Sequence, residues 1–198
     1  MGREVCRADS RSQGLPVIFR ETSLKGAYVI EPERKEDDRG FFARTWCQRE
    51  FEAQGLNATW VQSNISMNYR KGTLRGMHHQ DAPHEEVKLV RCTMGAIYDV
   101  IIDLRPASPT YCQHVGVRLT AENGYAVYIP KQFAHGFLTL EANSEVSYHM
   151  SSFYAPASAC GFRWDDPTFG IQWPEAVVVI SEKDCSWPVF PYTQDIRQ

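Results

Sequence analysis

Four side chains that can move a proton or stabilise a charge recur at intervals along the chain. His78 lies in the stretch Gly72-Thr-Leu-Arg-Gly-Met-His-His-Gln80, and it is followed by Lys88, Tyr148 and Asp166. Histidine titrates near neutral pH and is therefore the natural general base. Together with a lysine, a tyrosine and a carboxylate, it suits the transfer of a proton at a carbon next to a carbonyl.

The alternation of apolar residues gives Lys88 and Tyr148 hydrophobic neighbours. Every second side chain of a strand shares a face, so Lys88 lies with Val90 and Cys92, and Tyr148 lies with Val146. If these strands line an interior, burial alone lowers the pKa of a lysine and raises that of a tyrosine. If they are edge strands, both side chains extend into water. The parity argument alone leaves both alternatives open.

His78 and His79 are adjacent, so in a regular strand we expect one to face the site and the other to face away. A metal interpretation also exists, because scattered residues resemble the ligands of metal-binding cupins: His78, Gln80, His84, Glu85, Glu86 and His135. Those cupins typically show His-x-His, whereas the third position here is Gln80, a poor ligand. We therefore expect no metal, and a metal-dependent cupin oxygenase or isomerase is the alternative.

Asp166 precedes a proline, where a turn starter is the ordinary interpretation. The functional interpretation is a buried carboxylate that accepts a histidine N–H, fixes the tautomer and stabilises the imidazolium. No glycine-rich phosphate loop is present, so side chains would have to hold any phosphate. Guanidinium groups match phosphate oxygens, and the candidates are Arg39, Arg75, Arg105, Arg118 and Arg163.

Short strands are the elements that must position these groups. Strands are expected over residues 27–31, 59–66, 73–79, 86–93, 95–104, 113–120, 125–129, 136–140 and 144–151. One helix is expected over 46–54, with Gly55 as its stop. Asn123-Gly124 predicts a hairpin between 115–120 and 125–129. Evenly spaced strands without long helices predict an all-β, antiparallel jelly-roll or cupin sandwich with a few short helices.

The composition favours one domain and gives no sign of a membrane or nucleic-acid protein. The chain has 198 residues and a net charge of −3. We expect a polar N-terminal extension over 1–22, or an arm on a partner, and one domain over 23–198. No apolar run is long enough to span a membrane, and the N-terminus lacks the apolar core of a signal peptide. A cytoplasmic protein with reduced cysteines is therefore expected.

The chain resembles the dTDP-4-dehydrorhamnose 3,5-epimerases, a cupin-type family of sugar-nucleotide epimerases. Matching stretches run in constant order from about residue 24 to 184. They include Asp-Arg39-Gly-Phe-Phe, Gln62-Ser-Asn64-Ile-Ser, Gly-Thr-Leu-Arg75-Gly-Met-His78, Lys88-Leu-Val-Arg-Cys, Tyr-Ile-Pro-Lys-Gln-Phe-Ala-His135-Gly-Phe, Glu-Val-Ser-Tyr148 and Trp-Asp-Asp166-Pro. Together these stretches are specific for the family, although no single stretch would be.

The resemblance implies a 4-keto-6-deoxyhexose linked to a nucleoside diphosphate as the substrate, in deoxysugar (rhamnose-like) biosynthesis. The C4 carbonyl acidifies the protons at C3 and C5. By analogy, His78 takes the proton, Asp166 orients and charges His78, and Lys88 stabilises the enolate oxygen. Tyr148 returns a proton from the opposite face, which inverts the centre.

The resemblance also implies binding residues and a partner. His135 would hold the sugar, while Arg75, Gln62 and Asn64 would hold the diphosphate and nucleoside. Arg39 would hold phosphate across the interface of a homodimer, because family members exchange N-terminal strands. No metal and no redox cofactor are implied.

Some residues depart from the family pattern. His79 follows the base where relatives usually have an aromatic residue, and Arg44 replaces a glutamate expected near the nucleoside. Residues 1–20 have no recognised counterpart. Relatives also include enzymes that invert only C3 or only C5, or that use another nucleotide. A non-catalytic sugar-nucleotide binding module is a further alternative, but binding alone does not need all four candidate catalytic groups.

Overall fold

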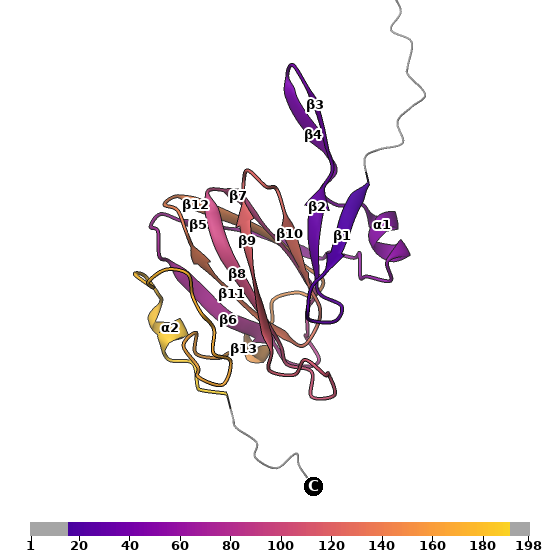
Figure 1. Cartoon of the computed structure of the whole chain (residues 1–198). Helices are drawn as coiled ribbons and strands as arrows, with labels where there is room; N and C mark the ends of the chain where they lie inside the picture. Colours follow the sequence, from indigo (N-terminus) through magenta and orange to yellow (C-terminus); the bar gives the residue numbers. More distant parts are fainter. Residues whose placement is uncertain (1–15, 191–198) are drawn as a thin grey trace, which may run out of the picture.

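The computed structural model describes residues 16–190, which form a sandwich of two antiparallel sheets (Figure 1). The first sheet has the order β1 (Val17–Glu21), β2 (Tyr28–Pro32), β10 (Ala126–Ile129), β7 (Lys88–Met94), β12 (Ser144–Met150) and β5 (Gln62–Asn68). The second has the order β13 (Ala159–Gly161), β6 (Leu74–Gln80), β11 (Phe133–Thr139), β8 (Ala96–Asp103) and β9 (His114–Thr120). The predicted all-β sandwich is confirmed.

The first sheet begins earlier in the chain than the sequence predicted. β1 lies inside the stretch 1–22 that was expected to be a polar extension, yet it pairs with β2 from Val17 to Glu21. Val17 is buried in the core. The expected boundary at residue 22 is therefore wrong, and the predictions for residues 1–15 lie outside the described residues.

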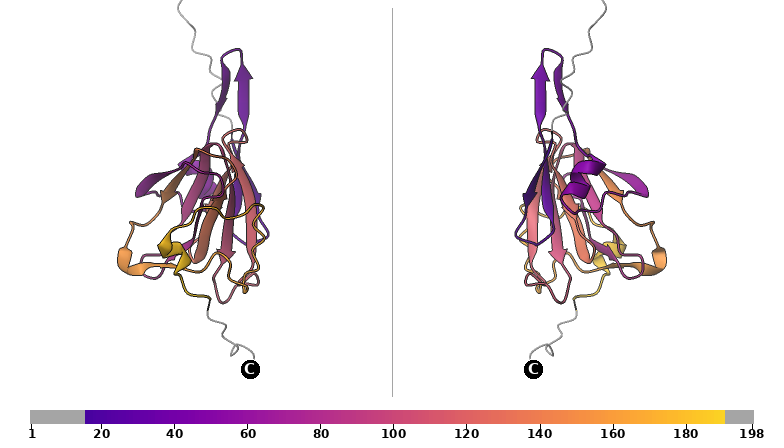
Figure 2. Two further views of the ribbon diagram at one scale, coloured as in Figure 1. Left: turned by 90° about the vertical axis from the view of Figure 1, so that its left-hand side faces the viewer. Right: turned by 90° about the vertical axis from the view of Figure 1, so that its right-hand side faces the viewer.

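A hairpin of β3 (Arg34–Asp37) and β4 (Gly40–Ala43) projects beyond one end of the sandwich (Figure 2). The sequence pattern predicts no strand over these residues. The strands of the hairpin expose most of their side chains, including Phe41 and Phe42, so no buried face produces an alternating pattern. Strand pairing here depends on backbone hydrogen bonds, which hydrophobic periodicity does not report.

Within residues 16–190, helical structure is limited to α1 (Gln48–Ala53), a short 3₁₀ segment (Pro156–Ser158) and α2 (Glu182–Cys185). α1 confirms the expected helix and ends before Gly55, whose positive φ of 72° suits a residue without a Cβ. Its Phe51 is fully buried against the outer face of the first sheet, beside Ile30 and Tyr128. Among residues 16–190, no helix is long and apolar enough to cross a membrane.

Both faces of the two sheets are covered by hydrophobic clusters. The central cluster joins Val90 and Val146 of the first sheet to Ile101 and Phe137 of the second. Outside the second sheet, another cluster includes Met77 and is covered by Phe162, Phe169 and Phe190 of the C-terminal segment. Double-sided burial explains why the central strands read as continuous apolar runs.

The Asn123-Gly124 turn does not make the predicted hairpin. β9 pairs with β8 in the second sheet, whereas β10 lies between β2 and β7 in the first. Asn123 Oδ1 accepts hydrogen bonds from the backbone N–H groups of Thr120 and Tyr125, so the turn geometry is local and tight. The turn therefore connects the two layers, and its local chemistry gives no information about which sheet follows.

Two glycines allow β6 and β11 to approach closely beside the site. A Cβ on Gly76 would lie 2.6 Å from the Cα of Gly136, and a Cβ on Gly136 would lie 2.6 Å from the sulfur of Met77. Any larger residue at either position would push the strands apart. The close approach sets the positions of His78 on β6 and His135 on β11, which are directly paired in register.

Candidate active site

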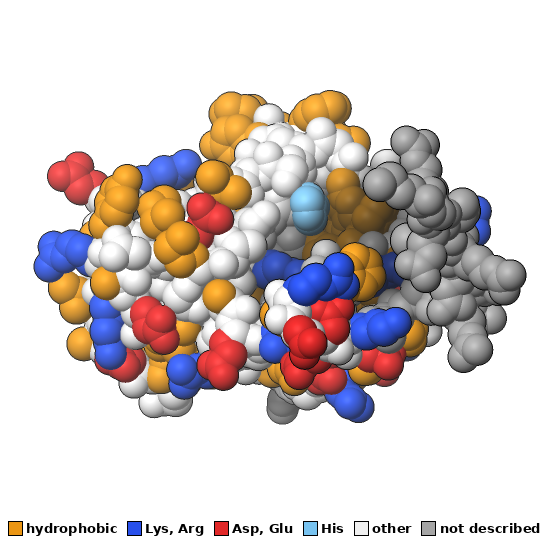
Figure 3. All heavy atoms as spheres, turned by 90° about the horizontal axis from the view of Figure 1, so that it is seen from above, with side chains coloured by type: hydrophobic (Ala, Val, Ile, Leu, Met, Phe, Trp, Pro, Cys, Tyr) orange, Lys and Arg blue, Asp and Glu red, His pale blue; other side chains and the backbone are white. Residues whose placement is uncertain are grey.

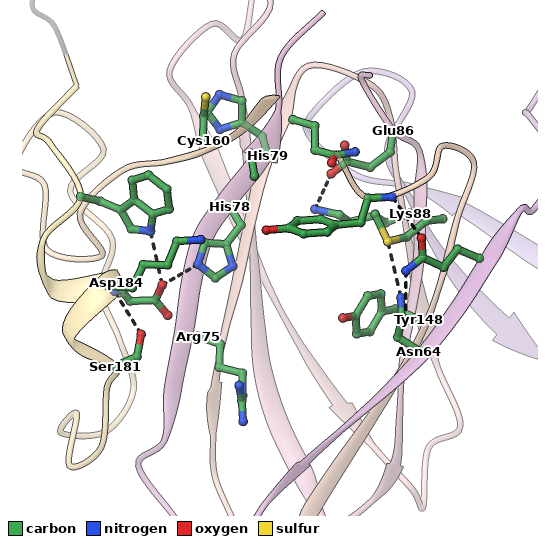
Figure 4. Close-up of a pocket in the computed structure, with 17 residues that line it drawn as sticks. Asn64, Arg75, His78, His79, Glu86, Lys88, Tyr148, Cys160, Ser181 and Asp184 are labelled. Carbon is green, nitrogen blue, oxygen red and sulfur yellow. Dashed lines mark hydrogen bonds and ion pairs between the residues drawn. The ribbon is translucent and has the colours of Figure 1, made fainter. Parts of the chain in front are cut away.

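The candidate residues converge on a cavity of about 500 Å³ between the two sheets, closed on one side by α2 (Figure 4). A second cavity of about 430 Å³ adjoins it. The residues that line both cavities are Arg75, His78, Lys88 and Tyr148. Three of the four predicted catalytic groups therefore lie where the two cavities meet.

The end of the sandwich that carries the hairpin has a recess bordered by both charged and hydrophobic side chains (Figure 3). Viewed from that end, the surface is hollowed beside a histidine side chain, with Lys and Arg side chains at one margin and hydrophobic side chains at others (Figure 3). Asp and Glu side chains lie next to these cationic groups, so the margin of the recess carries both signs of charge (Figure 3).

His78 faces Lys88 and Tyr148 across the cavity (Figure 4). His78 projects from β6 of the second sheet, whereas Lys88 and Tyr148 belong to β7 and β12 of the first. β7 lies between β10 and β12, so it is not an edge strand. The interior alternative predicted from parity is confirmed for Lys88, whose side chain is only 10% exposed.

His78 is held by a carboxylate that the sequence analysis did not identify. Its Nε2 lies 2.6 Å from Oδ1 of Asp184 on α2. The indole of Trp187 donates to the same oxygen, and the N–H of Gly76 donates to Oδ2. Burial would raise the pKa of Asp184, but the hydrogen bonds led by that of His78 outweigh it and hold the pKa below its usual value. An ionised Asp184 accepts Nε2–H, which leaves Nδ1 of His78 free as the base.

The predicted contact between Asp166 and His78 is therefore wrong. The carboxylate of Asp166 is buried elsewhere, where it accepts hydrogen bonds from the backbone N–H groups of Thr168 and Phe190. It fixes the turn that begins before Pro167 and ties it to the C-terminal segment. This corresponds to the ordinary interpretation of an aspartate before proline, that of a turn starter.

Lys88 forms an ion pair with Glu86 inside the cavity. Its Nζ lies 2.8 Å from Oε1 of Glu86, and both side chains are at least nine-tenths buried. The other oxygen, Oε2, is buried without a hydrogen-bond partner within the described chain. The pair keeps the ammonium in a fixed position and leaves Oε2 able to accept a bond from a ligand hydroxyl.

Tyr148 carries its hydroxyl on the wall opposite His78. Burial raises the pKa of Tyr148, and the positive charge of Arg75 opposes that shift only in part. The phenol therefore stays protonated at neutral pH and is suited to donate a proton. Tyr148 pairs in register with Val90 and Met150 pairs with Lys88, so the phenol and the ammonium emerge close together on one sheet face.

The predicted binding residues divide into three positions. Gln62, Asn64 and Arg75 line the larger cavity. His135 lines the smaller one, where its Nε2 lies 2.7 Å from the buried carboxylate of Asp99. Arg39 is on the projecting hairpin, 90% exposed and paired with Asp37, so within one chain it is separate from both cavities.

Arg44 and His79, the two residues that depart from the family pattern, both have defined contacts in the structure. Arg44 pairs with Glu50 of α1, which also accepts the N–H of Val17, so Arg44 helps to fix the helix against β1. His79 stacks on Phe162, with ring centroids 5.1 Å apart, and lines the larger cavity beside His78. Phe162 belongs to the cluster outside the second sheet, so His79 points away from Lys88 and Tyr148 and reaches only the margin of the cavity, and the expectation that one of the two histidines faces the site and the other faces away is confirmed.

The cupin-type ligand set of the metal alternative does not assemble. His84 contacts Ser158, Glu85 contacts Gln132, and Glu86 pairs with Lys88. Among residues 16–190, the one group of His, Cys, Asp or Glu side chains close enough to share a metal ion is His79, Asp81 and Cys160. Cys47, Cys92, Cys112, Cys160 and Cys185 all carry free thiols in the structure.

Sequence reasoning missed the wall of the cavity that the C-terminal segment supplies: Ser181, Lys183, Asp184 and Trp187. One local signal was available. Ser181 accepts a hydrogen bond from the N–H of Asp184, three residues later, which is the pattern of a helix start. That signal locates α2 but does not reveal that its carboxylate reaches His78.

Comparison with known proteins agrees with this geometry. The family model for dTDP-4-dehydrorhamnose 3,5-epimerase matches residues 21–191. The enzyme of that name from Methanothermobacter thermautotrophicus is 46% identical over 172 residues, covering 85% of this chain and 92% of the relative. The crystal structure of the Elizabethkingia anophelis enzyme superposes with a TM-score of 0.85 at 40% identity, covering 88% of this chain and 96% of that chain.

A further solved structure contains a ligand. It is the dTDP-6-deoxy-D-glucose-3,5-epimerase from Legionella pneumophila in complex with dTDP-4-keto-L-rhamnose. It superposes with a TM-score of 0.83 at 36% identity, covering 88% of this chain and 93% of that chain. These relatives match along most of their own length, and the two solved structures share the fold of this chain.

Proposed function

The chain belongs to the dTDP-4-dehydrorhamnose 3,5-epimerase family, and from this premise we propose that it inverts C3 and C5 of a dTDP-linked 4-keto-6-deoxyhexose. The reaction is an isomerisation by proton transfer next to the C4 ketone, in deoxysugar biosynthesis. The sequence left the nucleotide open, and the names of the relatives favour dTDP.

One observation carries the mechanism: a histidine base and a tyrosine acid occupy opposite walls of one cavity. Nδ1 of His78 takes the proton from carbon, and the electron pair of the broken C–H bond moves onto the C4 oxygen. Tyr148 then donates its phenolic proton to the same carbon from the other face, which inverts the centre. Return of a proton from His78⁺ to the tyrosinate through solvent restores the enzyme.

Lys88 supplies the charge that makes the intermediate accessible. The enolate is a full negative charge on oxygen, and a buried ammonium stabilises it far better than water does. Glu86 holds the ammonium at 2.8 Å and thereby fixes its direction. Asp184, rather than Asp166, fixes the tautomer of His78 and stabilises the imidazolium.

The two adjoining cavities suit the two halves of the substrate. His135 lines the smaller cavity and would hold the sugar hydroxyls, while Gln62 and Asn64 line the larger one and would hold the nucleoside. Arg75 lines both; its Nε donates to the amide oxygen of Asn68, and among residues 16–190 no carboxylate pairs with its guanidinium. An uncompensated guanidinium at that junction suits the diphosphate.

The projecting hairpin supports a homodimer as the working form. Phe41 is 56% exposed and Phe42 is 68% exposed, and such a hairpin is typical of an arm that packs on a partner. Arg39 would then reach the phosphate of the neighbouring subunit. Replacing both phenylalanines by serine is expected to produce monomers in sedimentation experiments, and unchanged dimers would contradict the arm. A cytoplasmic location stays a prediction from the sequence.

The experiment that tests the function is proton NMR in D₂O with dTDP-, UDP- and GDP-linked 4-keto-6-deoxyglucose. Wash-in of solvent deuterium at both C3 and C5 of the dTDP sugar is expected. Exchange at one carbon alone would identify a single-centre epimerase, and no exchange with any sugar would refute the proposal. Protein treated with a chelator should keep its turnover; a loss restored by added metal would favour the metal-dependent cupin instead.

A further inference from the structure

A group of three metal-binding side chains lies at the end of β6, on the margin of the larger cavity. It consists of His79, Asp81 and Cys160, whose nearest ligand atoms all lie within 4.8 Å of one another. None of the three has a role in the proposed proton transfer. We propose that these residues form a labile binding site for Zn²⁺.

The distances within the group suit a tetrahedral ion. Nε2 of His79 lies 3.3 Å from Oδ1 of Asp81, and Sγ of Cys160 lies 3.2 Å from Oδ2. Zinc bonds of about 2.0 Å to nitrogen and oxygen and about 2.3 Å to sulfur place tetrahedral ligands about 3.3–3.6 Å apart. The two contacts use different oxygens of Asp81, and the ligand atoms of the three residues lie within 4.8 Å of one another, so an ion would replace the contacts by drawing the side chains together.

The fold holds two of the ligands before any ion arrives. His79 and Cys160 are directly paired in the register of β6 and β13, so their backbones are fixed relative to each other. The ring of His79 is stacked on Phe162 at an interplanar angle of 17°, which sets the direction of Nε2. Asp81 follows the last residue of β6 and remains 64% exposed, so it can adjust to the ion.

The protonation states permit binding with the release of one proton. The thiol of Cys160 donates a hydrogen bond to Oδ2 of Asp81, so it carries its proton in the metal-free protein. Coordination forms the Zn–S bond, breaks the S–H bond and passes the proton to buffer.

The donor set selects zinc over the common hard cations. One sulfur, one nitrogen and one oxygen match the ligands of Zn²⁺, whereas Mg²⁺ and Ca²⁺ require oxygen ligands. Three protein ligands leave the fourth position to water or another small ligand. Zinc-bound histidines usually donate the N–H of their other ring nitrogen to a neighbouring acceptor, which strengthens binding. Nδ1 of His79 is buried without such an acceptor in the described chain. We therefore expect exchangeable zinc that a chelator removes.

The test uses the full chain after chelator treatment, titrated with Zn²⁺ against a chromophoric chelator and separately with Co²⁺. One equivalent is expected, and Co²⁺ should give a near-ultraviolet thiolate charge-transfer band. Cys160→Ser should abolish that band and weaken Zn²⁺ binding at least about 100-fold. His79→Phe and Asp81→Asn should each weaken binding by about 10-fold or more.

Matched controls are Cys47→Ser and His114→Gln, which change the same residue types away from the group. Both should bind like the unaltered chain. A readout without substitution is the alkylation rate of Cys160, which Zn²⁺ should slow while Mg²⁺ leaves it unchanged. Equal Zn²⁺ affinity in Cys160→Ser, the absence of a thiolate band, or alkylation unaffected by Zn²⁺ would overturn the site.

Discussion

Oδ1 of Asp184 lies 2.6 Å from Nε2 of His78, while Oδ2 of the same carboxylate accepts the backbone N–H of Gly76. The carboxylate is thus fixed to the strand that carries the histidine as well as to the ring itself. The residue reaches this position because Ser181 caps the short helix that presents it. The histidine is held in one tautomer, with its other nitrogen left for the substrate.

Asp184→Asn should lower kcat by about 10²–10⁴-fold with little change in substrate affinity. An amide cannot stabilise the imidazolium, and it can donate to Nε2 and so favour the wrong tautomer. Steady-state turnover and deuterium wash-in at C3 measure the loss.

Asp166→Asn is the matched control for that variant. Its carboxylate anchors the backbone at Thr168 and Phe190 and does not touch His78. The change should lower the melting temperature while turnover per folded molecule stays near normal. A loss of turnover in Asp166→Asn as deep as in Asp184→Asn, without unfolding, would restore Asp166 as the partner of the base.

Lys88→Met should reduce deuterium exchange by about 10²–10³-fold, because the enolate loses its buried positive charge. The variant also leaves Glu86 buried and unpaired, which costs about 3–5 kcal/mol of folding free energy. Chemical denaturation separates that effect from the loss of exchange.

The double variant Glu86→Gln/Lys88→Met distinguishes chemistry from stability. Removing both charges should recover most of the free energy of unfolding, because no uncompensated ion remains in the interior. Exchange should stay low. If exchange recovered together with stability, the ammonium would have no part in stabilising the enolate.

The sequence predicted the catalytic strands well because local patterns carry the information. Lys88 and Tyr148 sit among apolar residues, and parity gave each its face-sharing neighbours but left an interior face and an edge strand as alternatives; the structure shows the interior face. The partner of His78 lies 106 positions away along the chain. No periodicity or spacing links two residues at that distance, so Asp166, the carboxylate beside a recognisable motif, was predicted in place of Asp184.

The fold shows the same division between local and long-range information. The helix around Phe51 and the stop at Gly55 were predictable from periodicity and turn chemistry. The Asn123-Gly124 turn has the local geometry expected of it, yet it joins strands in different sheets. The sheet that each strand joins depends on its long-range partner, β8 for β9 and β7 for β10. Tertiary packing, and not the local sequence, selects that partner.

Tyr148→Phe should still wash in deuterium at the acidic carbons but form little inverted product. The base and the lysine remain on their walls, so abstraction and return from the same face continue. Loss of the phenol removes the donor on the opposite face, where it is kept protonated by burial. Parallel measurement of exchange and product by NMR tests this, and an equal fall in both would mean that Tyr148 acts before the enolate forms.

Asp103 should contribute to stability at neutral pH but not in acid. Hydrogen bonds from Arg105, Ser108 and Thr110 outweigh the effect of burial and lower the pKa of Asp103 to about 2. Because this folded-state pKa lies below the ordinary aspartate pKa of 3.8, the contribution is present above about pH 4 and is lost as the pH falls toward 2. Asp103→Asn should therefore lower the free energy of unfolding by about 1–2 kcal/mol at pH 7 and by less at pH 3. Urea denaturation at both values measures the difference.

Asp165→Asn, which removes an exposed pair with Arg163, is the control and should change the free energy of unfolding little at either pH. A deficit in Asp103→Asn that does not depend on pH would contradict the assignment.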